Sequence, residues 1–176
     1  MKAYQDGPFR YFDDVTRSVD FLVQAVLIAI MVGLLALLNF QVLMRYVIRT
    51  PLIWGGELGG FLLAYVTLWG CSTCIRNDKH VRVRYIESAL PAKLKRILSI
   101  VIHLIILFYL YYLIVYGYQF AELGIGEKTT SGAFEFFWPR FSMTSGGILM
   151  ALQTVNILVR ETVQLVAGEP YPPAPE

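Results

Sequence analysis

The segment FLVQAVLIAIMVGLLALLNFQVLM, at positions 21–44, decides the fold of this chain. It contains 24 residues and no Asp, Glu, Lys or Arg. An α-helix needs about 20 apolar residues to cross the hydrocarbon core of a bilayer. Three further charge-free segments, at positions 58–75, 97–121 and 141–159, contain 18, 25 and 19 residues. The sequence therefore predicts an all-α integral membrane protein with four transmembrane helices.

The overall composition agrees with this fold class. Hydrophobic residues make up 56% of the 176 residues and charged residues 16%, whereas charged residues are about 25% of a soluble domain. A formal net charge of +2 is too small to indicate a nucleic-acid partner. The composition thus excludes a soluble enzyme, a disordered protein and a nucleic-acid-binding protein.

The ends of the chain give the domain boundaries. We expect no cleavable signal peptide, because the first apolar segment is longer than the roughly 7–15 residues of a signal core. We expect a four-helix membrane domain at residues 1–167. The last residues, 168–176, contain four prolines and are predicted to form a disordered tail.

The distribution of lysine and arginine predicts the orientation, because cytoplasmic flanks of membrane helices are enriched in these residues. Placing both termini in the cytoplasm gives 11 basic residues inside and 4 outside. Seven of them lie in the loop at positions 76–96. Apolar residues recur there every three or four positions. This spacing predicts a short amphipathic surface helix between the second and third membrane helices, with its basic side toward phospholipids.

Polar and small residues within the apolar segments predict where the helices pack. Because lipid offers a polar side chain no partner, we expect three side chains of the first helix to face other helices. These are Gln24, Asn39 and Gln41. The second helix begins with two glycine pairs, 55 with 59 and 56 with 60, which permit close helix packing or a flexible helix start. The fourth helix has a further small face, formed by Ser142, Ser145, Gly146 and Gly147.

Few residues suggest chemistry. Cys71 and Cys74 are too few for a structural zinc site, which has four ligands, and we interpret them as small packing residues. His103 is interpreted as a packed polar group, and His80 lies outside the second helix, so a bis-histidine haem is not expected. We predict no catalytic, metal-binding or cofactor-binding residue. Three alternatives stay open: a four-helix membrane thiol oxidase, a haem or quinone membrane anchor subunit, and a small autonomous exporter.

From position 45 onward the order of residues resembles a known family. The matching residues are Arg45-Tyr46-Val47, Pro51-Leu52-Ile53-Trp54, Glu57-Leu58, Gly70, Arg76 and Asp78-Lys79-His80-Val81. The pattern is similar to the small membrane subunit, DctQ type, of tripartite ATP-independent periplasmic (TRAP) transporters. The resemblance is sharpest over residues 45–91, and the family's four helices with both ends inside agree with the topology predicted above.

The resemblance implies a role in symport across the bacterial inner membrane. In the family, a periplasmic substrate-binding protein delivers an organic acid to a complex of the small subunit and a large membrane subunit, DctM type. The large subunit holds the sodium and substrate sites. By this resemblance, the present chain is a scaffold that braces the large subunit. It is not an enzyme, and it holds no cofactor of its own.

The resemblance also implies which residues contact the large subunit or anchor the chain in the membrane. These candidates are Arg45, Tyr46, Trp54, Glu57, Arg76 and His80. The chain departs from the family pattern at Gly56 and Gly60, where an acid and an arginine are common, and at Arg84, where the family often has Asp. The first two positions are one helical turn apart, so both partners of an ion pair are missing together.

Overall fold

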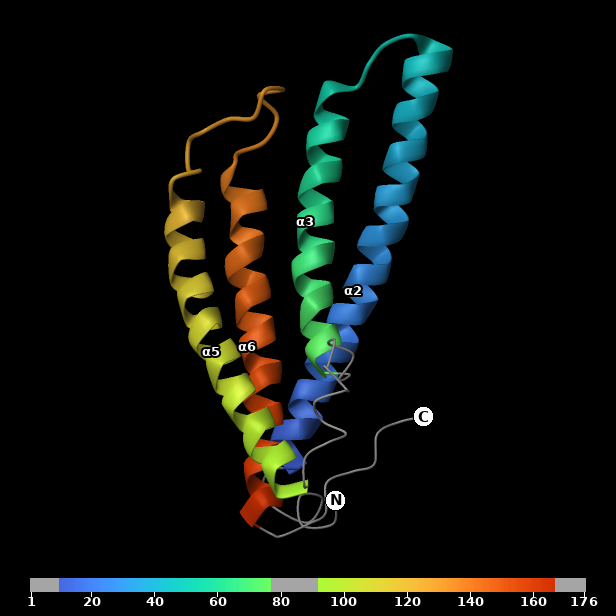
Figure 1. Ribbon diagram of the computed structural model, residues 1–176. Coiled ribbons are helices and arrows are strands. Elements are labelled where there is room, and N and C mark those ends of the chain that lie inside the picture. The colour runs from blue at the N-terminus through green and yellow to red at the C-terminus, as the bar shows by residue number, and fades with distance from the viewer. Residues whose placement is uncertain (1–9, 77–91, 167–176) are drawn as a thin grey trace.

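The computed structural model describes residues 10–76 and 92–166, which form four long helices (Figure 1). They are α2 (Arg10–Leu43), which continues into the π-helical turn η1 (Met44–Ile48), then α3 (Ile53–Arg76), α5 (Ala92–Glu122) and α6 (Phe137–Val166). Each is long and apolar enough to cross a membrane. The prediction of an all-α protein with four transmembrane helices is confirmed. The surface helix was predicted within the loop 76–96; positions 77–91 of that loop, with His80, lie outside the described residues, and residues 92–96 form the start of α5. The proline-rich tail, 168–176, also lies outside the described residues.

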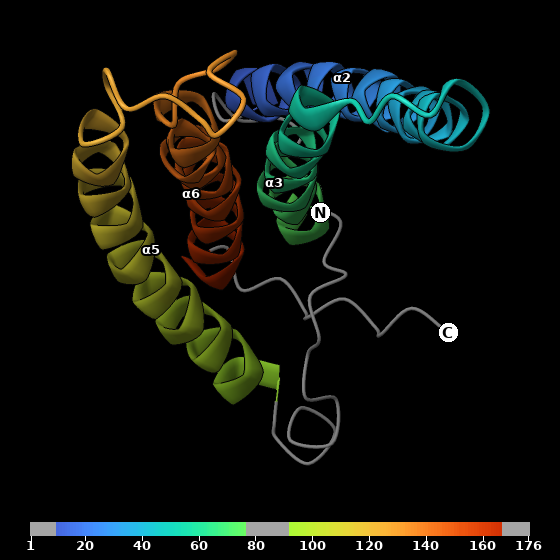
Figure 2. The same ribbon diagram turned by 90° about the horizontal axis from the view of Figure 1, so that it is seen from above.

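The helices form an open row rather than a closed bundle. Viewed from above, the order in space is α5, α6, α3 and α2 (Figure 2). The main packing pairs are α5 with α6, α6 with α3, and α3 with α2. Although α3 and α5 are consecutive in the chain, α6 therefore lies between them. We call the end where α2 begins the lower end and the end where α3 begins the upper end, as in Figure 1.

The break between the first two helices follows from local sequence. Proline at position 51 disfavours the helical conformation of the residue before it. Arg49 has a φ of 60° and caps the preceding turn by donating its backbone N–H to the carbonyl of Met44. The Thr50 N–H donates to the same carbonyl at 3.2 Å. The chain then reverses direction and α3 starts at Ile53.

Helix α6 is the central helix because small residues on two of its sides let neighbours approach. A Cβ added to Gly146 would lie 2.7 Å from Leu68 Cβ on α3. One added to Gly147 would lie 2.9 Å from Ile114 Cγ1 on α5. Half of the apolar part of α6 is buried, against 11% for α2. The predicted small packing face of the fourth helix is thus confirmed.

The two glycine pairs of α3 have different environments. Gly55 and Gly59 are buried against α2, and a Cβ on Gly55 would lie 2.9 Å from the Nε2 atom of Gln41. Gly56 and Gly60 are exposed, with open space where a Cβ would be. One pair therefore packs within the chain, and the other leaves a smooth, open strip on α3.

The three polar residues of the first helix also differ. Gln41 packs against α3, as predicted. Gln24 donates a hydrogen bond to Asp20 of its own helix at 2.8 Å. Asn39 is exposed and donates to the Leu35 carbonyl at 2.7 Å. The expectation that Asn39 faces another helix is wrong for this chain, because its side chain satisfies one of its donors on its own backbone.

Candidate functional site

A set of contacts at the upper end connects α3 to the loop between α5 and α6. We call these contacts the upper clasp; they involve Glu57, Phe61, Ser131 and Phe134. We call residues 123–136 the upper loop. The carboxylate of Glu57 accepts a hydrogen bond from the backbone N–H of Ser131 at 2.9 Å and a second from the Ser131 hydroxyl. Phe61, one turn further along α3, packs edge-on against Phe134, with ring centroids 6.0 Å apart. Both contacts hold the loop against the start of α3.

Two aromatic side chains of α3 continue this contact toward the membrane interior. The Tyr65 hydroxyl donates to the Trp138 carbonyl at 2.8 Å. The indole N–H of Trp69 donates to the Ser145 hydroxyl at 3.0 Å. Because lipid cannot replace these bonds, each one favours the packing of α3 against α6.

The upper loop is also held from within. Its backbone folds back on itself through bonds between Thr129 and Phe134 and between Glu127 and Phe136. Arg140, at the start of α6, pairs with Glu127 at 2.8 Å. Its guanidinium also lies 5.3 Å from the ring centroid of Phe136, a distance at which a cation and an aromatic ring attract. These contacts therefore give the upper loop a defined conformation at the upper end.

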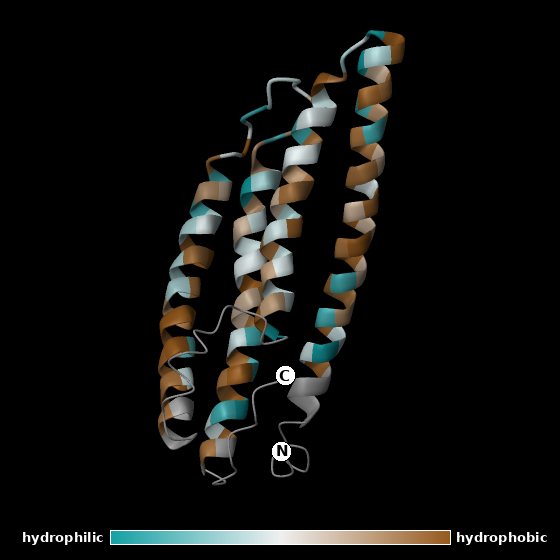
Figure 3. Cartoon of the chain, turned by 45° about the vertical axis from the view of Figure 1, so that its right-hand side comes forward, coloured by the Kyte–Doolittle hydropathy of each residue, from teal (hydrophilic) through white to brown (hydrophobic). Residues whose placement is uncertain are grey.

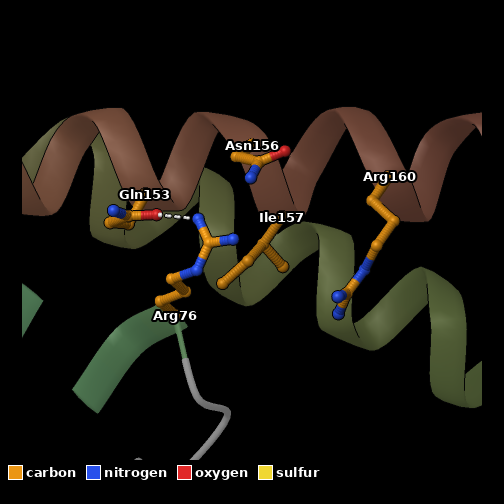
Figure 4. A pocket seen from close by; sticks show the side chains of 5 residues that line it. All are labelled: Arg76, Gln153, Asn156, Ile157 and Arg160. Atoms are coloured by element: carbon orange, nitrogen blue, oxygen red, sulfur yellow. Dashed lines mark hydrogen bonds between the residues drawn. The ribbon is translucent and has the colours of Figure 1, made fainter. Parts of the chain in front are cut away.

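A second set of polar contacts joins three helices at the lower end. We call it the lower polar cluster: Thr16, Asp20, Gln24, Arg76, Gln153 and Asn156. The Nε atom of Arg76, the last residue of α3, lies 3.7 Å from Asp20 Oδ2 on α2. Its Nη1 atom lies 3.4 Å from the Gln153 side-chain oxygen on α6, a contact drawn in Figure 4.

The α6 side of the lower polar cluster is buried. The side-chain amide of Asn156 donates to the Thr16 hydroxyl at 2.8 Å, and Gln153 donates to the Thr16 carbonyl at 3.5 Å. Gln153 is 2% exposed and Asp20 is 6% exposed. A buried polar group that loses its partner is costly, so these contacts fix how α2, α3 and α6 meet.

The structure does not bring the sequence-predicted interface residues together as one site. Arg45, Tyr46 and Trp54 lie at the upper end, where Tyr46 is 73% exposed and Trp54 is 37% exposed. Glu57 lies at the same end, where its carboxylate accepts hydrogen bonds from Ser131. Arg76 lies at the opposite end, inside the lower polar cluster.

The cysteines and the described histidine have ordinary environments. Both cysteines are free thiols; Cys71 packs against the hydrophobic core and Cys74 is exposed. The interpretation as packing residues therefore holds for Cys71 and not for Cys74. The Nδ1 atom of His103 lies 2.7 Å from the Ser99 carbonyl, as expected for a packed polar group.

Three residues that make these contacts were not predicted from the sequence: Asp20, Ser131 and Gln153. The available signal for Gln153 was its spacing of three residues from Asn156 within a charge-free segment, which places both amides on one face of α6. Ser131 gave no signal, because it contacts a residue 74 positions away. Such pairs depend on how the helices pack.

Four helices with polar contacts at both ends define a multi-pass membrane protein. Residues 34–164 match the family described as tripartite ATP-independent periplasmic transporters, DctQ component. The chain belongs to this family, and the resemblance inferred from residues 45–91 is confirmed. Because the family comprises membrane subunits of transporters, the chain is not an enzyme, and the thiol oxidase alternative is set aside.

Individual relatives support the same assignment. The sialic acid TRAP transporter small permease protein SiaQ of Vibrio cholerae is 26% identical over 140 residues, which cover 80% of this chain and 81% of SiaQ. The C4-dicarboxylate TRAP transporter small permease protein DctQ of the same organism is 29% identical over 92 residues, covering 52% and 39%. The sialic acid TRAP transporter permease protein SiaT of Haemophilus influenzae is 23% identical over 144 residues, covering 81% of this chain and 23% of SiaT.

Proposed function

We propose that this chain is the small scaffold subunit of a sodium-driven TRAP transporter. It braces a large membrane subunit, DctM type, while that subunit carries an organic acid across the membrane. A periplasmic substrate-binding protein delivers the acid, and sodium binds in the large subunit. The proposed location is the bacterial inner membrane, with both termini in the cytoplasm.

One observation carries the proposal. The similarity to SiaT covers 81% of this chain but only 23% of that longer permease. A segment like this chain therefore occurs as part of a larger permease polypeptide. Two units that are joined in one polypeptide work side by side, and we infer the same arrangement for this chain and a large transport unit.

The shape of the chain supports a bracing role. Helix α2 packs mainly against α3 and is hydrophobic along most of its length (Figure 3). An open row of helices presents a long apolar side to its surroundings and encloses little. Such a row of helices can cover one side of a larger membrane protein. The complex then has a larger area embedded in the bilayer, which resists tilting of the large subunit.

We further propose distinct roles for the six candidate residues. The exposed side chains of Arg45, Tyr46 and Trp54 contact the large subunit or anchor the chain at the membrane surface. Glu57 acts through the upper loop that it holds, and Arg76 through the lower polar cluster. His80 stays a candidate for contact with the large subunit or with phospholipids.

Copurification tests the partnership directly. The full chain is tagged, extracted from its native membrane in mild detergent, and analysed by mass spectrometry. We expect a much larger polytopic membrane protein at near-equal amount. A chain that is recovered alone, or only with itself, would overturn the proposal and favour the autonomous exporter.

A matched pair of tryptophan variants tests the contact at the upper end. Trp54→Ala is expected to reduce recovery of the large subunit severalfold. Trp138→Ala removes an exposed indole at the same end, on α6, and is expected to leave recovery unchanged. Equal losses in the two variants would identify both side chains as general membrane anchors.

Uptake measurements test substrate and coupling. Deletion of this chain should abolish sodium-dependent uptake of the transported acid by cells. Sialic acid and C4-dicarboxylates are the first substrates to try, because relatives are named for them. Uptake that persists without the chain would contradict the scaffold role.

A reporter fused to the C-terminus tests the proposed cytoplasmic location of that end of the chain.

A further inference from the structure

A polar pocket lies between α3 and α6 at the lower end. Its lining consists of Arg76, Gln153, Asn156, Ile157 and Arg160, shown in Figure 4. The cavity measures about 130 Å³, and a water molecule occupies about 30 Å³ of liquid, so a group of several heavy atoms fits. Among these lining residues, both charged members are arginines and none is an acid.

The pocket lies at the boundary between the apolar interior of the membrane and the headgroup layer. Arg76 and Arg160 are the first charged residues after the charge-free segments 58–75 and 141–159. Asp20 directly precedes the charge-free segment 21–44 and lies 3.7 Å from Arg76. Three apolar segments thus end at one level, and the two arginines lie at that level.

The floor of the pocket is fixed before any ligand binds. Gln153 and Asn156 are buried and are held by bonds to Thr16. Gln153 also contacts the guanidinium of Arg76. Arg160 extends from α6 on the other side of Ile157 (Figure 4). The two guanidinium groups therefore flank one apolar side chain.

Two arginines in such a frame suit a phosphate. A guanidinium has a planar set of donors that matches phosphate oxygens and can bind them in pairs. Asp20 offsets part of the charge of Arg76, which leaves the charge of Arg160 as the main attraction for an anion. Ile157 offers apolar contact to whatever carries the phosphate. A lipid, whose phosphate adjoins a glycerol and acyl chains, matches this combination better than a free ion does.

We propose that this pocket binds the phosphate of an anionic phospholipid headgroup. Bound there, the lipid joins α3 and α6 at the membrane surface. The site belongs to this chain alone and does not depend on its role beside a large subunit.

Native mass spectrometry of the full chain, purified with the subunits that accompany it, tests the site with dioleoyl phosphatidylglycerol as the probe. Arg160→Gln is expected to weaken lipid retention about tenfold, because it removes charge-assisted hydrogen bonds between the guanidinium and the phosphate. Arg160→Lys, which keeps the charge, should retain more of the lipid. Arg17→Gln is the matched control, because Arg17 is exposed on α2 at the same end and does not line the pocket.

The outcomes distinguish a specific lipid-binding site from general electrostatic attraction between basic residues and anionic lipids. Equal losses for Arg160→Gln and Arg17→Gln would overturn the proposal, since only net charge would then matter. Displacement of the lipid by excess inorganic phosphate would overturn the lipid source and assign a site for a soluble anion. If Arg160→Gln does not fold, a photoactivatable phosphatidylglycerol is applied to the unaltered chain. Adducts at peptides containing Arg76 and Arg160 support the site, and evenly spread adducts overturn it.

Discussion

Helices α2 and α6 differ in how much of each is buried within the chain. The more polar helix is the more buried one, whereas in a soluble protein the more apolar helix would be. Helix α2 has the longer apolar segment, yet only 11% of its apolar part is buried within the chain. Helix α6 carries serines, threonines, glycines and amides, and half of its apolar part is buried. In a membrane, lipid solvates apolar side chains as well as protein does, so packing depends on small residues and on polar contacts. The more polar helix is therefore the central one.

The largest expected loss of stability comes from placing a large side chain in the interface between α6 and α3. Gly146→Leu places a side chain where a Cβ alone would lie 2.7 Å from Leu68 Cβ. We expect a loss of ~3 kcal/mol or more, because overpacking forces backbone shifts. Gly33→Leu on α2 is the matched control, since nothing lies within 4 Å of a Cβ there. Thermal stability in detergent, followed by size-exclusion chromatography, measures both. Similar losses would contradict the central position of α6.

The next effect concerns the lower polar cluster, where α2 is tied to the other helices. Asp20→Asn removes the charge that faces Arg76 and is expected to cost about 1–3 kcal/mol, as loss of a buried hydrogen-bonded charge does. A double-mutant cycle with Arg76→Gln isolates the pair. Arg17→Gln serves as a surface control. A coupling energy near zero would show that the contact at 3.7 Å contributes nothing to the docking of α2.

A smaller effect is expected at the upper clasp. Glu57→Ala frees Ser131 and should expose the upper loop, because the loop then loses both bonds to α3. Limited proteolysis of the purified chain should cut the loop severalfold faster, since cleavage follows the population of the open form. Glu122→Ala removes an exposed acid at the same end. Unchanged cleavage in Glu57→Ala would show that Phe61 and the internal bonds of the loop suffice.

The smallest effect on the chain itself is expected on the exposed side of α2. Asn39→Leu removes an exposed polar side chain whose amide donates to the Leu35 carbonyl of its own helix. Stability of the isolated chain should change by no more than about 0.5 kcal/mol. If α2 lies against the large subunit, copurification should nevertheless fall. Unchanged recovery of the large subunit would indicate that this side of α2 faces lipid.

Sequence patterns predicted the helices well and their contacts poorly. The charge-free segments located all four helices, and the small residues of α6 indicated its packing face, because both depend on local composition. Glu57 is a candidate for contact with the large subunit or for membrane anchoring, and its bond to Ser131, 74 residues later, could not be predicted from the sequence. Arg76 is likewise a candidate for contact with the large subunit or the membrane, and the structure adds that it lies between Asp20 and Gln153. These pairings join distant segments, and no local spacing encodes them.

The sequence by itself determined that this chain is a four-helix membrane protein of the DctQ family, because bilayer thickness fixes the length of an apolar helix and the residues after position 45 carry the family pattern. Only the tertiary structure decided that the helices form a row with α6 between α3 and α5. It alone also placed Arg76 and Arg160 in one pocket. The physical reason is that lipid accepts every apolar face equally, so the order of the helices depends on close contacts and buried polar pairs that form only on packing.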